Sequence, residues 1–174
     1  MNKINRYSLI VAFFLSFSVQ AAPFGEADDV NYSQKLWKAM SDASYVGQDS
    51  IMSTPYTGQH PHGAVLDTIE GPVLIGRKLH HVIIKRNYGG PGVSKMAVAN
   101  DPAKYLKAVT VMLKRDGYDA DNKDWFWVKY KPDGSLHTNP KGMKLAGRVA
   151  KGMPAGCIAC HKAAPGGDMI YNHD

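Results

Sequence analysis

Four segments between residues 64 and 131 have the composition of β-strands, and they limit the folds that this chain can adopt. These segments, rich in β-branched and aromatic residues, are residues 64–70, 79–87, 105–118 and 125–131. In the third segment, Val109, Val111 and Leu113 alternate with other residues, which is the period of two expected of a strand. The connecting sequences are short and turn-like, whereas parallel strands need long crossovers. The pattern therefore predicts an antiparallel sheet of four or five strands.

One helix is predicted on each side of this strand-rich region. Residues 26–43 place Leu36, Trp37 and Met40 on one apolar face, and Ser33 is a candidate cap for this helix. A second, short helix is expected to begin near Cys157. The predicted fold class is therefore α+β, with an N-terminal helix, the antiparallel sheet and a short C-terminal helix.

The first 21 residues have the features of a secretory signal peptide. Lys3 and Arg6 precede an apolar run that is too short to span a bilayer as a settled helix. Val19 and Ala21 are small residues at the positions that a signal peptidase reads. An N-terminal membrane anchor is the alternative. The favoured prediction is cleavage after Ala21, which leaves residues 22–174 as a single exported domain with a periplasmic location.

The charge pattern argues against nucleic acid as a partner. The 174-residue chain carries a net charge of +6, which falls to +4 when the two basic residues of the signal peptide are removed. Its lysines are scattered, whereas nucleic-acid-binding tails contain runs of basic residues. No later stretch is long and apolar enough to cross a membrane, so the mature protein is expected to be soluble.

The only two cysteines stand three residues apart and are followed directly by a histidine. Cys157, Cys160 and His161 form the attachment pattern of c-type haem, in which two thiols bond to the porphyrin vinyl groups. The adjacent histidine then ligates the iron from the proximal side. A redox dithiol would be expected early in a thioredoxin-like fold, and zinc would need a fourth ligand. A structural disulfide would not need the histidine. One covalent haem c is therefore the predicted cofactor.

The late position of the motif restricts the second axial ligand. At most 13 residues follow His161, and Met169 is too near in the chain to reach the opposite face of the ring. The sixth coordination position must therefore be served by the earlier sheet, or be open. Cytochromes c-prime that are four-helix bundles also carry a late motif, but residues 64–131 do not have a helical pattern.

Three stretches resemble the P-460 cytochromes, which share their fold with the β-sheet kind of cytochrome c-prime. They are HHVIIKRNYGG (80–90), TVMLKRDGYDADNKDWFWVKYKPDG (110–134) and GCIACHKAAPGGDMIY (156–171), and they occur in the order of the family. The resemblance covers most of the chain after the signal peptide. It implies a sheet-based haem domain, and the dimers that the family often forms make a homodimer an expectation.

The resemblance also indicates which lysine could bond to the haem ring. In this family a strand lysine can become covalently attached to the porphyrin, and Lys85 occupies the matching position after three apolar residues. Arg86 follows it, where many relatives carry an acid. Strand alternation places Lys85 on the same face as His81 and Ile83, and Arg86 on the opposite face.

Residues 58–66 occupy the place where the family supplies side chains to the distal side of the haem. His60 and His62 are therefore candidates to hydrogen-bond an iron-bound ligand or to ligate the iron directly; a turn with surface histidines is the structural alternative.

The resemblance implies oxidation or binding of small nitrogen compounds, and three classes of function stay open. The first is a hydroxylamine-oxidising oxidoreductase, in which a distal histidine takes protons and a periplasmic partner takes electrons. The second is a protein that binds nitric oxide without turnover. The third is a simple electron carrier, which would need a strong sixth ligand from the protein.

Overall fold

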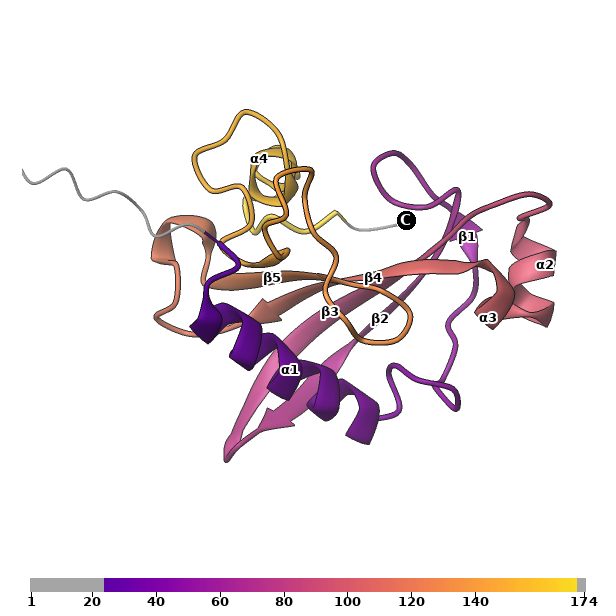
Figure 1. The fold of residues 1–174 in the computed structure, drawn as a ribbon, viewed down its shortest axis with the longest axis horizontal. Coiled ribbons are helices and arrows are strands. Elements are labelled where there is room, and N and C mark those ends of the chain that lie inside the picture. The colour runs from indigo at the N-terminus through magenta and orange to yellow at the C-terminus, as the bar shows by residue number, and fades with distance from the viewer. Residues whose placement is uncertain (1–23, 172–174) are drawn as a thin grey trace, which may run out of the picture.

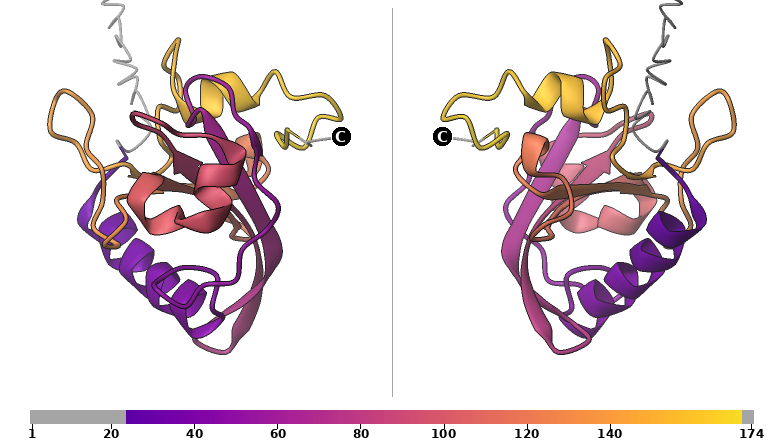
Figure 2. Two further views of the ribbon diagram at one scale, coloured as in Figure 1. Left: turned by 90° about the vertical axis from the view of Figure 1, so that its right-hand side faces the viewer. Right: turned by 90° about the vertical axis from the view of Figure 1, so that its left-hand side faces the viewer.

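The computed structural model describes residues 24–171, and the predicted signal peptide lies outside this range. A six-stranded antiparallel sheet has the order β1-β2-β3-β4-β5-β6, so every strand pairs with its neighbours in sequence. Helix α1 lies against one face of the sheet and α4 lies on the other side (Figures 1 and 2). The strands are β1 (Tyr56–Thr57), β2 (Val65–Ile75), β3 (Lys78–Tyr88), β4 (Leu106–Lys114), β5 (Trp125–Tyr130) and β6 (Ala146–Gly147), and the helices are α1 (Ala27–Asp42), α2 (Lys95–Asn100), α3 (Pro102–Tyr105), the 3-10 turn η1 (Ala120–Asn122) and α4 (Cys157–His161).

The predicted α+β class is confirmed, including its N-terminal helix and short C-terminal helix. The sheet has six strands rather than four or five because the two-residue strands β1 and β6 extend its edges. Strand β2 also continues through Gly71 and Pro72, which had a turn-like appearance in the sequence. Pro72 is tolerated because β1 pairs with β2 only as far as Leu66, so no described strand needs an N–H from Pro72.

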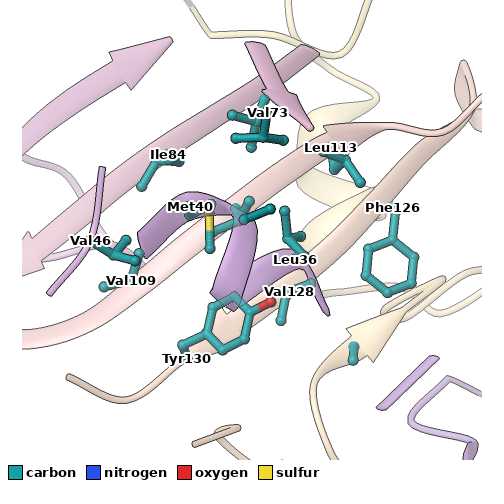
Figure 3. Packing of buried hydrophobic residues seen from close by; sticks show 14 residues of the cluster. Leu36, Met40, Val46, Val73, Ile84, Val109, Leu113, Phe126, Val128 and Tyr130 are labelled. Carbon is teal, nitrogen blue, oxygen red and sulfur yellow. The ribbon is translucent and has the colours of Figure 1, made fainter. Parts of the chain in front are cut away.

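The main core fills the space between α1 and the sheet. Leu36 and Met40 of α1 are fully buried in one cluster with strand residues such as Ile84, Val109 and Phe126 (Figure 3). Burial of a side chain of this size stabilises the fold by about 1.5–3 kcal/mol. This packing buries one face of the sheet.

The predicted capping role of Ser33 is wrong. Ser33 lies inside α1, fully buried, and its hydroxyl donates a hydrogen bond of 2.7 Å to the carbonyl oxygen of Val30. The helix begins about two turns earlier, after Glu26, and Asp28 and Asp29 in its first turn favour the positive end of the helix dipole.

The opposite face of the sheet packs against the C-terminal segment. Ile83, Met112 and Trp127 from three neighbouring strands form a second cluster with Ile158 of α4 and with Met169. The predicted alternation of β3 is confirmed, since Val82 and Ile84 belong to the core under α1 whereas Ile83 belongs to this second cluster. This face is where the sheet meets the cysteine motif.

None of the helices within residues 24–171 combines the length and the apolar character needed to cross a membrane.

Candidate functional site

Helix α4 consists of the cysteine motif itself. Gly156 precedes it with φ 127° and ψ −172°, a conformation that is essentially restricted to glycine. A Cβ atom at Gly156 would lie 2.4 Å from the Cβ of Ala150, so the chain passes too closely for a side chain there. Both thiols are free, with Cys157 partly buried and Cys160 exposed. Burial raises the pKa of the Cys157 thiol, which is the opposite of what a reactive redox dithiol needs.

His161 is buried at the end of α4 and held in one tautomer. Its Nδ1 atom lies 2.7 Å from the carbonyl oxygen of Met169, which can only accept, so Nδ1 carries the proton and Nε2 keeps its lone pair. The ring packs edge-on against Trp127, with centroids 4.7 Å apart, and against Tyr171 at 5.4 Å. Burial lowers the pKa of His161, and the Lys85 charge adds to this. Nothing in residues 24–171 hydrogen-bonds to Nε2, which leaves it available for a metal.

His62 lies across from His161, although the two residues are far apart in sequence. The imidazole centroids are 6.3 Å apart and the ring planes are nearly perpendicular, at 86°. The Nδ1 atom of His62 lies 3.0 Å from Oδ1 of Asn87 and 3.4 Å from the hydroxyl of Thr110. Desolvation, followed by the nearby charge of Lys85, lowers the pKa of His62 to about 4, so the imidazole is neutral at pH 7.

The amide of Asn87 determines the tautomer of His62. Its Nδ2 donates to the carbonyl oxygens of Lys85, at 2.8 Å, and Ala108, at 3.2 Å, which fixes the amide orientation. Oδ1 must therefore face His62 as an acceptor, so Nδ1 of His62 is the protonated nitrogen. Nε2 of His62 then keeps its lone pair, as it does in His161.

Lys85 lies on the same face of the sheet, buried to 8% exposure. Its Nζ lies 3.4 Å from the carbonyl oxygen of Tyr171, and no described carboxylate forms an ion pair with it. Burial lowers the pKa of this amine. In the strand register, Lys85 stands opposite Thr110, which in turn stands opposite Lys129 of β5. The lysine is thus held beside the two histidines without a partner of opposite charge.

Two other candidates lie away from this cluster. His60 is exposed on the loop before β2 and makes none of the contacts at His161. His81 shares the face of Lys85 but is near the far end of β3, where its Nε2 lies 3.0 Å from Glu70. Arg86 points to the opposite face, as predicted from alternation, and forms a buried two-bond ion pair with Asp67 at 2.7 and 2.8 Å.

The residues in this region fit a large metal-bearing aromatic group. Two free thiols and an imidazole lie on one short helix, beneath a sheet face lined by Trp127, Met112 and Ile83. The buried indole Nε1 of Trp127 has no hydrogen-bond partner within the described residues, so it is available to an acceptor on such a group. Residues 24–171 contain no cluster of three or more His, Cys, Asp or Glu side chains that could hold a metal ion by themselves.

Comparison with models of protein families identifies the family of this chain. The family model described as Cytochrome P460 matches residues 80–172, which is more than half of the sequence. The chain belongs to the cytochrome P460 family. It is therefore a haem cytochrome of that family, and the match spans Lys85, Asn87, Trp127 and the cysteine motif. Searches of curated proteins and of solved structures gave no match.

Sequence reasoning missed the groups that orient the two histidines. In the sequence Met169 stands out only for its sulfur, whereas in the structure its backbone carbonyl accepts the hydrogen bond from His161. Asn87 and Thr110 were not identified, although alternation places Asn87 on the face of Lys85, two residues away. Strand alternation could therefore have pointed to Asn87, but its partner His62 lies on a loop whose path a local sequence pattern does not predict.

Proposed function

We propose that this P460-family chain is an exported mono-haem c-type cytochrome that binds and redox-converts small nitrogen compounds such as hydroxylamine and nitric oxide. In this proposal Cys157 and Cys160 form thioethers with the haem and His161 is the proximal iron ligand. The free thiols on consecutive turns of α4 and the available Nε2 of His161 support this assignment. The signal-peptide prediction supports export to the periplasm, where an electron-accepting partner would act and where this type of haem is attached.

One observation carries the choice of small-ligand chemistry: the side facing His161 is polar and hydrogen-bonded. His62, Asn87 and Thr110 form a connected network there, with Lys85 beside them. When bound, the haem supplies an iron that takes up a small ligand and exchanges single electrons. The protein side chains would orient such a ligand, and the neutral imidazole of His62 would be available to accept a proton from it.

Lys85 is the proposed site of the family's covalent bond to the porphyrin. Its amine is buried next to His161 and His62 and is not neutralised by a described carboxylate. Family membership and this position support the assignment together. Lys129 stands two strands away in the same row of the sheet and serves as a matched control for a lysine on this face.

Mass spectrometry of protease digests of the exported protein tests the covalent assignments. We expect the haem to travel with the peptide that contains Cys157 and Cys160, and the peptide that contains Lys85 to travel with both. Lys85→Ala should release the second peptide, whereas Lys129→Ala should not. A haem peptide that never includes Lys85 would refute the crosslink and leave the thioether assignment to stand by itself.

Hydroxylamine oxidation with an added electron acceptor tests the reaction. We expect turnover by the haem-loaded protein and its loss in His161→Ala. Tight nitric oxide binding without any hydroxylamine turnover would instead assign the chain to the gas-binding function, and failure to bind either compound would refute the proposal.

A further inference from the structure

We infer that His62 is the second axial ligand of the haem iron in the resting protein, so that the iron is held between two histidines. The inference rests on the proposed placement of haem at His161. It deepens the proposed function, because a small nitrogen compound would then reach the iron only by displacing a side chain of the protein itself.

The separation of the two rings matches this arrangement. An imidazole nitrogen binds a first-row metal ion at about 2.0 Å, and the ring centroid lies roughly 1 Å further from the metal, so two axial imidazoles have centroids roughly 6 Å apart. The observed separation between His62 and His161 is 6.3 Å. A distal histidine that only hydrogen-bonds an iron-bound ligand must leave room for that ligand between its ring and the iron. Its ring centroid would then lie further from that of His161 than two axial ligands allow. The perpendicular ring planes are compatible with ligation, because each plane can contain its own iron–nitrogen bond.

Both histidines are also prepared as metal ligands by their surroundings. Histidines that bind metals nearly always donate their other N–H to a carbonyl or carboxylate, which fixes the tautomer and the ring orientation. His161 donates from Nδ1 to the Met169 carbonyl, and His62 donates from Nδ1 to the Asn87 amide oxygen. The same pattern on the two sides leaves Nε2 as the ligating atom in each ring.

Other side chains are poorer candidates for this position. The backbone carbonyl of Met169 accepts the hydrogen bond from Nδ1 of His161, so Met169 belongs to the side of His161. His60 is exposed. The amine of Lys85 is directed to the carbonyl oxygen of Tyr171, a residue that itself packs against His161. Of these side chains, only His62 has an imidazole ring at the distance from His161 that two axial ligands of one iron would have.

An external ligand must displace His62 before it binds the iron, and this competition lowers the apparent affinity for that ligand. The observed affinity falls in proportion to the fraction of molecules in which the sixth position is vacant. If His62 occupies the iron most of the time, we expect His62→Ala to bind azide or nitric oxide roughly tenfold or more tightly than the original chain.

Electron paramagnetic resonance and near-infrared magnetic circular dichroism of the ferric, haem-loaded protein test the ligation directly. We expect a low-spin spectrum with the signature of two nitrogen ligands. His62→Ala should become high-spin, and added imidazole should restore the low-spin form, which also shows that the variant is folded. His60→Ala, a change to the other histidine of the same loop, is the matched control and should retain the low-spin spectrum.

A high-spin ferric spectrum of the unmodified protein would overturn the inference, as would a low-spin spectrum that survives in His62→Ala. Conversion to high spin by Lys85→Ala but not by His62→Ala would overturn it in favour of a lysine ligand. These outcomes are independent of the proposed function: a protein with an open iron could still oxidise hydroxylamine, and a two-histidine protein that never turns over would retain the spectrum while failing the activity assay.

Discussion

At the scale of single residues, Arg86 follows the candidate haem lysine in sequence but acts on the other face of the sheet. The Arg86 side chain is 6% exposed and its partner Asp67 is completely buried, and the two stand opposite each other in the β2–β3 register. Ser50 and Tyr88 complete the hydrogen bonding around this pair. Arg86 therefore makes no direct contact with the site near Lys85. Its ion pair with Asp67 stabilises the opposite face of the sheet.

Arg86→Met should strongly destabilise the protein, because it leaves the carboxylate of Asp67 buried without a cation. Removal of one partner of a buried ion pair costs about 3–5 kcal/mol. The exposed pair of Lys38 and Asp42 on α1 is a suitable control, and Lys38→Ala should cost no more than about 0.5 kcal/mol. Denaturant unfolding of the haem-loaded proteins, followed by circular dichroism, measures both. Equal losses for the two variants would contradict the assigned role of Arg86.

At the scale of elements, the start of α4 depends on a glycine. Gly156→Ala should lower the fraction of purified protein that carries haem, because the new Cβ would meet Ala150 and the backbone angles suit only glycine. Gly152 in the same loop also has positive φ, at 74°, but a Cβ there meets nothing within 4 Å. The ratio of haem absorbance to protein should therefore fall clearly more in Gly156→Ala than in Gly152→Ala. A similar ratio in both would show that the start of α4 tolerates a side chain.

Helix α1 stabilises the sheet from the face opposite to the haem site. Leu36→Ala should lower the free energy of unfolding by about 2–5 kcal/mol, since Leu36 is fully buried and its removal leaves a cavity. Gln34→Ala, at an exposed position of the same helix, should change it by less than about 0.5 kcal/mol. Thermal or denaturant unfolding distinguishes the two. A small effect at Leu36 would mean that the core under α1 can collapse around the missing side chain.

At the scale of the whole molecule, the sheet separates the core under α1 from the face on which we propose that the haem binds. The core under α1 consists of side chains packed on one another, whereas the opposite face relies on the short helix α4 and the loops around it. We expect a Cys157→Ser/Cys160→Ser protein without haem to keep its amide protection in α1 and in β3–β5. Residues 156–171 should exchange faster than in the haem-loaded protein, because the cofactor would no longer fix the five-residue helix α4.

Hydrogen–deuterium exchange with peptide resolution measures this difference against the haem-loaded protein. Loss of protection throughout the chain at once would show that the two faces of the sheet fold as one unit and that the haem stabilises both.

Local patterns in the sequence were sufficient for the elements and for the proximal side of the site. Strand alternation in β3 and β4 correctly separated Val82, Ile84 and Arg86 from Ile83 and Lys85, because side-chain direction in a strand follows from residue number alone. The cysteine motif likewise indicates its cofactor, since two thiols and an imidazole within five residues meet on one helical turn and a half. The Cytochrome P460 match supports the haem assignment on independent grounds.

The opposite side of the site required the tertiary structure. His60 and His62 are equivalent candidates in the sequence, but only His62 is brought against Asn87 of β3 and opposite His161. Those contacts depend on how the loop before β2 folds over the sheet and on where α4 docks, and no short-range periodicity contains that information. The sequence alone thus indicated haem and a candidate proximal ligand, His161. Long-range packing decided which histidine lies opposite His161, because the two residues come from segments nearly a hundred residues apart.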